Sequence, residues 1–137
     1  MKSQIWNNKE EIQYKKAYEQ LDEFFEELYH QNDSIKTLTY REGQNSYALD
    51  IMESIKNKSI QLIQAGVGIG KSFGYLLPIF YTYDNVEKFN KIIISTSSIA
   101  LQEQLLKDVE KISKMLDIKI NTEILKGINN YACLKRI

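Results

Sequence analysis

The chain has 137 residues, 43% of them hydrophobic and 26% charged, which is ordinary for a globular protein large enough to bury a core. Its 18 basic and 18 acidic residues cancel, so binding of nucleic acid through an overall positive charge is excluded. It has one cysteine and no apolar run near the roughly 20 residues of a membrane span, which predicts a cytoplasmic protein without internal disulfides or a membrane partner.

The first predicted element is an amphipathic helix over residues 9–30, where apolar and aromatic residues recur at helical spacing between acidic ones. Its apolar face is broad, so we expect the helix to pack on its own chain, with partner binding as the alternative. The polar residues 31–38 predict a linker. The sequence therefore divides into a helical N-terminal segment with its linker (1–38) and a second domain (39–137).

Helical patterns and short apolar runs alternate through the second domain. In order, they predict a helix over 46–56, a strand over 59–64, a helix from Lys71, a strand over 91–96, a helix after Ser97 and Ser98, and a strand over 118–125. Pro78 should kink the helix that begins at Lys71 or end its regular part. Strands separated by helices imply an α/β fold with a parallel sheet between helices.

The segment Ala65–Ser72 (AGVGIGKS) joins the first predicted strand to the next helix and carries the strongest chemical signal. Its three glycines let the backbone curl around an anion with N–H groups pointing inward, and the helix start adds further amides. Lys71 supplies a positive charge for the β- and γ-phosphates, and the Ser72 hydroxyl is a typical Mg²⁺ ligand. Apart from Ala65 at the first position, the segment matches the phosphate-binding pattern G-x-x-x-x-G-K-[ST].

Four blocks over roughly residues 40–136 resemble, in the same order, the N-terminal part of the DinG/XPD-type superfamily-2 DNA helicases. The first block is YREGQ at 40–44, which is similar to the R-x-G-Q block, and the second is 65–72 with GYLLP at 74–78, which is similar to motif I. The third block is ISTSS at 94–98 with Leu101 and Gln104-Leu105, and it is similar to motif Ia. The fourth block, residues 126–136, is similar to the K-G-R-x-N-Y-x-C-x-x-R block. The resemblance implies a P-loop NTPase with a partial RecA-like domain. Its parent activity would be ATP-driven unwinding of, or translocation on, DNA, with single-stranded DNA as the expected partner.

The resemblance also implies roles for individual residues. The catalytic residues would be Lys71 and Ser72, with Ser72 holding Mg²⁺ through ATP. The nucleotide-binding residues would be Arg41, Gln44 (on the adenine edge), Ala65, Gly66, Val67, Gly68, Ile69, Gly70, Lys71 and Ser72. The residues on the DNA backbone would be Thr96, Ser98 and Gln104. Cys133 would be the first of four ligands of a [4Fe-4S] cluster in a full-length parent. Val67 and Ile69 replace threonines that are common in the family, and Ile128 replaces an arginine.

Parts needed for hydrolysis are missing from the 137 residues. No D-E-A-H-type acidic motif occurs, and one cysteine cannot supply the four thiolates of a cluster. We therefore expect the chain alone to be inactive and free of iron, with the remainder of a helicase chain as its partner and with self-association as a further expectation. Two alternatives stay open: another P-loop NTPase or phosphotransferase, or a non-catalytic nucleotide- or protein-binding remnant. Without the resemblance, Gln44 is better explained as a turn residue that caps the following helix, and Cys133 as a small buried or half-exposed side chain. For Thr96 and Ser98 the alternative is ordinary helix capping, which is compatible with a contact to DNA.

Overall fold

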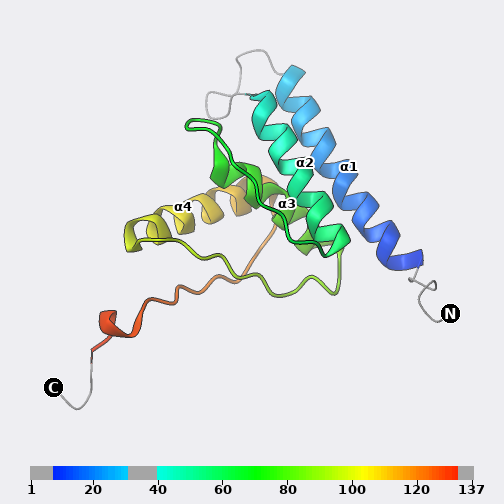
Figure 1. Ribbon diagram of the computed structural model, residues 1–137. Helices are drawn as coiled ribbons and strands as arrows, with labels where there is room; N and C mark the ends of the chain where they lie inside the picture. Colours follow the sequence, from blue (N-terminus) through cyan, green and yellow to red (C-terminus); the bar gives the residue numbers. More distant parts are fainter. Residues whose placement is uncertain (1–7, 31–39, 133–137) are drawn as a thin grey trace. The chain divides into compact units, whose positions relative to one another are not determined.

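The computed structural model describes residues 8–30 and 40–132, which form four α-helices and one 3₁₀ turn (Figure 1). The elements are α1 (Asn8–His30), α2 (Glu42–Asn57), α3 (Lys71–Asn85), α4 (Ile99–Leu116) and η1 (Ile128–Asn130). The chain separates into two compact units, residues 1–92 and residues 93–137. The first unit contains α1, α2 and α3, and the second contains α4 and η1. The expected boundary between residues 38 and 39 lies outside the described residues and stays a prediction.

The predicted α/β fold with a parallel sheet is wrong, because residues 8–30 and 40–132 contain helices and no strand. The segments 59–64, 91–96 and 118–125 are non-helical chain without strand pairing. Several apolar side chains in them are exposed, with Ile60 at 100% and Leu62 at 99%, although Ile118 is buried. A helix closes its hydrogen bonds within its own sequence, whereas a strand needs a neighbouring chain for every one of its bonds. The pattern of apolar residues located these segments but could not supply their partners.

In the first unit, α1, α2 and α3 pack against one another and bury a common core (Figure 1). The buried side chains of α1 are three or four residues apart, which places them on one face of the helix. They are Tyr14, Ala17, Leu21, Phe25 and Leu28. From the other two helices, Ala48, Met52, Leu76, Leu77 and Phe80 complete the core. The N-terminal helix thus packs on its own chain, as its aromatic face predicts.

A glycine lets α2 and α3 approach closely. A Cβ atom at Gly74 would lie 2.5 Å from Cδ1 of Tyr47 and 3.6 Å from Cγ of Gln44, so α2 occupies the space of the missing side chain. The helix α3 continues through Pro78 to Asn85 and does not end at the proline. The helix α2 begins at Glu42 rather than at residue 46, and this additional turn carries Gln44 towards the start of α3.

In the second unit, α4 begins and ends with recognisable caps. Oγ of Ser98 accepts a hydrogen bond from the Leu101 amide at 3.3 Å, so Ser98 is the N-cap that the sequence predicts. At the other end Asp117 adopts a left-handed conformation (φ 54°), and the Ile118 amide donates to the Ser113 carbonyl at 3.1 Å. Val109 and Ile112 of α4 are buried. Among the described helices, none combines the length and hydrophobicity that a membrane crossing requires.

Candidate phosphate-binding site

Residues 65–70 form a turn that leads directly into α3. Gly68 (φ 85°) and Gly70 (φ 80°) both lie in the left-handed region that favours glycine. Because α3 begins at Lys71, the amides of its first turn have no carbonyl partners within the helix. A glycine-rich turn followed by a helix N-terminus can hold a phosphate group through backbone amides and the helix dipole.

The Lys71 side chain, which follows the turn, reaches back to the residues at the start of the turn. Its Nζ donates to the carbonyl oxygens of Ala65 at 3.2 Å and Gly66 at 3.4 Å. The side chain is exposed and its ammonium has three hydrogens, so a phosphate oxygen can reach it from solvent. The lysine is therefore positioned both to shape the loop and to meet an anion.

The first turn of α2 contacts the other side of the loop. Nε2 of Gln44 donates to the Gly70 carbonyl at 2.8 Å, and Nη1 of Arg41 donates to the Gly68 carbonyl. A Cβ atom at Gly70 would overlap Nε2 of Gln44, so glycine is required there for space as well as for conformation. The structure thus places Arg41 and Gln44 beside the loop, where they contact loop carbonyls, and their predicted contact with a nucleotide stays a prediction.

Sequence analysis missed one residue of this contact, Gly43. A Cβ atom at Gly43 or at Gly66 would lie 3.6 Å from Cδ1 of Ile69, so the Ile69 side chain rests against the backbone of both glycines. Glycine in the first turn of a helix costs up to about 1 kcal/mol relative to alanine. Gly43 could have been recognised from this cost, because a glycine beside Gln44 at a helix start indicates that another segment approaches closely there.

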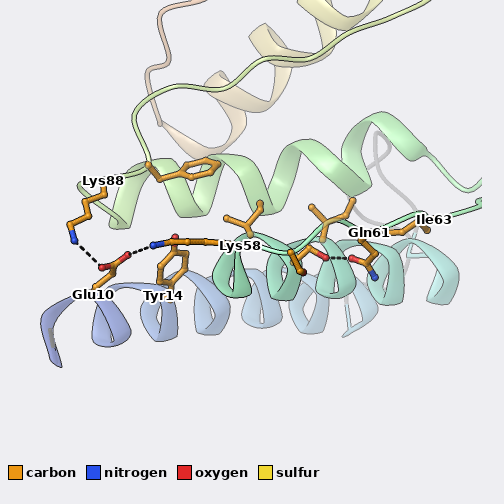
Figure 2. A pocket seen from close by; sticks show the side chains of 11 residues that line it. Glu10, Tyr14, Lys58, Gln61, Ile63 and Lys88 are labelled. Atoms are coloured by element: carbon orange, nitrogen blue, oxygen red, sulfur yellow. Dashed lines mark hydrogen bonds and ion pairs between the residues drawn. The ribbon is translucent and has the colours of Figure 1, made fainter. Parts of the chain in front are cut away.

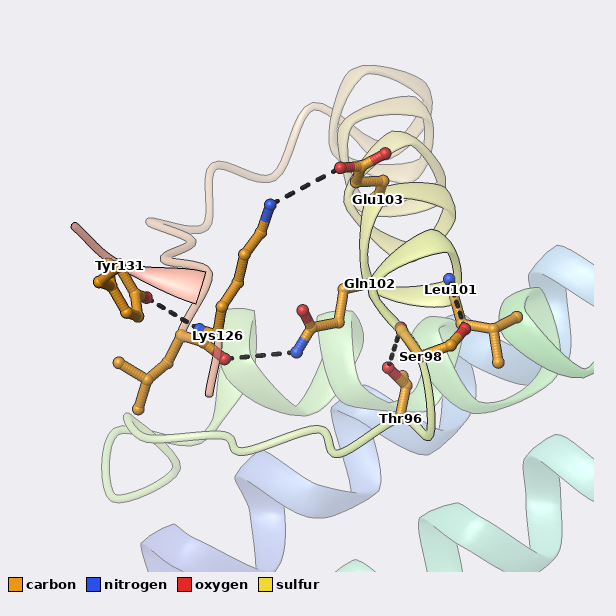
Figure 3. Close-up of polar contacts among 8 residues, drawn as sticks. Thr96, Ser98, Leu101, Gln102, Glu103, Lys126 and Tyr131 are labelled. Atoms are coloured by element: carbon orange, nitrogen blue, oxygen red, sulfur yellow. Dashed lines mark hydrogen bonds and ion pairs between the residues drawn. The ribbon is translucent and has the colours of Figure 1, made fainter. Parts of the chain in front are cut away.

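The residues predicted to contact DNA lie in the second unit, and Figure 3 shows two of them, Thr96 and Ser98. Oγ1 of Thr96 donates to the Ser98 carbonyl at 3.2 Å, while Oγ of Ser98 caps α4. Nε2 of Gln104 donates to Oδ1 of Asp108 at 3.2 Å on an exposed part of the helix. Local hydrogen bonds therefore fix all three side chains at the N-terminal half of α4.

A second segment is tied to the start of α4, as Figure 3 shows. Nε2 of Gln102 donates to the Leu125 carbonyl at 3.3 Å, and Nζ of Lys126 lies 3.7 Å from Oε1 of Glu103. The Lys126 amide donates to Oη of Tyr131 at 2.9 Å, and the tyrosine is 51% exposed. These contacts place a cation, Lys126, and an aromatic ring, Tyr131, beside the start of α4. Sequence analysis assigned neither residue to DNA binding, although a lysine and a tyrosine within six residues could have indicated such a site.

Cys133, the predicted cluster ligand, lies outside the described residues. Within the part of the chain that the structure does describe, no group of three or more His, Cys, Asp or Glu side chains could hold a metal ion. Ser72, the predicted Mg²⁺ ligand, is half-buried at the start of α3.

A cavity of about 530 Å³ in the first unit offers a competing ligand site (Figure 2). At one end, the Glu10 carboxylate lies 3.1 Å from Nζ of Lys88 and 3.6 Å from Nζ of Lys58. The hydrogen bond from Lys88 and the charges of both lysines hold the pKa of Glu10 below its usual value. Within the described chain, the residues that line the cavity include none from the loop 65–72.

Residues 18–137 match the DEAD/DEAH box helicase family, which covers most of the chain. The chain therefore belongs to the DEAD/DEAH box helicase family.

Individual relatives confirm the predicted resemblance to DinG-type helicases. The chain is 35% identical over 127 residues to the 3'-5' exonuclease DinG of Staphylococcus epidermidis, covering 92% of this chain and 14% of that protein. It is 38% identical over 98 residues to the ATP-dependent DNA helicase YoaA of Escherichia coli, covering 71% and 14% of the two chains. It is 32% identical over 126 residues to the probable ATP-dependent helicase YpvA of Bacillus subtilis, covering 90% and 19%. The chain thus spans between 14% and 19% of the length of these relatives. No solved structure matches it.

Proposed function

We propose that the chain binds Mg-ATP at the loop 65–72 and is the nucleotide-binding segment of an ATP-dependent DNA helicase. The observation that carries this proposal is the junction of loop and helix, where two left-handed glycines precede Lys71 and the lysine ammonium lies on the loop carbonyls. The amides of 66–72 would hold the phosphates, Lys71 would neutralise their charge, and Ser72 would ligate Mg²⁺. In a helicase, ATP supplies the phosphoanhydride bond whose cleavage drives movement on DNA.

We infer further that the 137 residues bind ATP without appreciable turnover. Phosphoryl transfer also needs a carboxylate on the metal and a positioned water, and no D-E-A-H-type motif occurs in the chain. Likewise, one cysteine is too few for an iron–sulfur cluster, so Cys133 would serve as a ligand only in a longer parent. Self-association and a cytoplasmic location stay proposals, supported by the exposed apolar side chains of 59–64 and by the single cysteine.

Calorimetric titration of Mg-ATP into the 137-residue chain tests the proposed nucleotide site. We expect saturable binding of one nucleotide per chain, together with negligible release of inorganic phosphate. Circular dichroism would establish that the titrated chain is helical. A helical chain that shows no binding at millimolar Mg-ATP would contradict the proposal.

We also propose that the start of α4 contacts phosphates of single-stranded DNA through Thr96, Ser98 and Gln104. Hydroxyl and amide groups at a helix start are suitable partners for phosphate oxygens and carry no base specificity. Lys126 and Tyr131, which hydrogen bonds and the ion pair with Glu103 hold beside the same helix start, would add a charge and a ring for base stacking.

Two substitutions at Ser98 separate a DNA contact from helix capping. Ser98→Ala should lower the free energy of unfolding by about 1 kcal/mol through loss of the cap, and should weaken DNA binding moderately. Ser98→Asp keeps a good cap but places a negative charge against the phosphates, so it should leave stability intact and weaken binding about tenfold. Fluorescence anisotropy with oligonucleotides of different sequence would measure both effects, which should be similar for each sequence. Wild-type affinity in Ser98→Asp would mean that Ser98 serves only as a cap.

A further inference from the structure

We propose that the N-cap and first turn of α2 form a brace for the phosphate-binding loop, with Arg41 and Gln44 as positioning residues. The brace is the contact of Arg41, Gly43 and Gln44 with residues 68–70. This inference rests on the proposed nucleotide site and gives Gln44 a positioning role besides the contact with adenine that the resemblance implies.

The two segments meet residue by residue. Arg41 donates to the Gly68 carbonyl, the backbone of Gly43 supports the side chain of Ile69, and Gln44 donates to the Gly70 carbonyl. Three consecutive loop residues are thus held from one side by the N-cap and first turn of α2. A chance contact of one side chain would not produce this continuous register.

The brace fixes the direction of loop amides. The described part of the chain has no cis peptide bonds, and in a trans peptide unit the C=O and the following N–H point in opposite directions. When Arg41 holds the Gly68 carbonyl towards α2, the N–H of Ile69 must point away from α2. In the same way, Gln44 fixes the N–H of Lys71. Both amides belong to the set proposed to bind phosphate, so the brace aligns these donors before a nucleotide arrives.

The position of Gln44 suits a role in positioning the loop. Its side chain packs on the loop and is buried, with 6% of the residue exposed. Behind it, the close approach of Tyr47 to Gly74 sets the distance between α2 and α3. The Gly70 carbonyl also accepts the Gly74 amide at 3.0 Å, so removing the Gln44 amide leaves that carbonyl with a partner.

Gln44→Met, which keeps the length of the side chain but removes the donor, tests the brace. The ligands are Mg-ATP and Mg-tripolyphosphate, which carries the phosphates without a base. We expect the affinity for tripolyphosphate to fall about 3- to 10-fold, the affinity for Mg-ATP to fall at least as far, and Tm to change little. A loss for Mg-ATP without a loss for tripolyphosphate would limit Gln44 to the contact with adenine and overturn the proposal. An unchanged affinity for both ligands would also overturn it.

Two further variants complete the test. Arg41→Leu changes an exposed residue, so it reports on the brace even if Gln44→Met lowers stability, and it should weaken both ligands alike. Gln13→Met makes the matched substitution on α1 and should leave both affinities unchanged. If the wild-type chain binds neither ligand, the nucleotide site itself is refuted; if it binds both and neither brace variant weakens tripolyphosphate, only the brace is refuted.

Discussion

Replacing Lys71 with alanine is expected to weaken binding of Mg-ATP by about 10- to 100-fold, because a hydrogen bond to a charged group contributes about 1.5–3 kcal/mol. The ammonium now lies on the carbonyls of Ala65 and Gly66, and would exchange these for phosphate oxygens. Since the side chain is exposed, its removal leaves the carbonyls open to water. Tm should therefore change little while affinity falls, and calorimetric titration measures the loss.

Lys16→Ala provides the control for net charge, since Lys16 is an exposed lysine of α1. It should bind Mg-ATP as the wild type does. Equal affinities in Lys71→Ala and Lys16→Ala would show that the phosphates bind elsewhere on the chain.

Gly74→Ala is expected to destabilise the first unit by about 1–3 kcal/mol, the usual cost of inserting a group into a filled core. The added methyl would lie 2.5 Å from Cδ1 of Tyr47, and α3 would have to move away from α2. That cost exceeds the gain of about 1 kcal/mol in helix propensity from glycine to alanine. The displacement would also draw Gln44 from the Gly70 carbonyl, so nucleotide affinity should fall with stability. Urea unfolding followed by circular dichroism measures the first effect.

Gly43→Ala is the matched control, because its new methyl would make an ordinary contact of 3.6 Å with Ile69. This variant should be at least as stable as the wild type. The double variant Tyr47→Ala with Gly74→Ala lacks the clash. Its loss of stability should therefore be smaller than the sum of the losses in the two single variants. Strict additivity, or a Gly74→Ala chain as stable as the wild type, would show that the two helices are not held at this distance.

The sequence predicted the elements whose hydrogen bonds are local. The helix expected over 9–30 spans Asn8–His30, and Ser98 caps α4 as its hydroxyl allows. The first turn of α2 was missed because Glu42–Asn45 is polar and contains a glycine, so it shows no apolar periodicity. The strands were predicted wrongly because an apolar run specifies which residues seek burial and says nothing about the partner that must pair with them.

The same distinction between local and long-range contacts applies to the candidate site. Glycines and a lysine at fixed spacing define the loop locally, so its position and helix start could be predicted. The contacts of Arg41 and Gln44 with the loop join residues that lie 27 and 26 positions apart in the sequence, and they exist only because α2 packs on α3 at Gly74. No periodicity within either segment encodes that contact.

Hydrogen–deuterium exchange of the 137-residue chain with and without Mg-ATP tests the central claim most directly, because exchange rates report on the loop amides themselves. We predict that Mg-ATP slows exchange at residues 66–72 and leaves α4 unchanged. Slower exchange around Lys58 and Lys88, beside the cavity of about 530 Å³, with unchanged rates at 66–72, would contradict a phosphate-binding role for the loop.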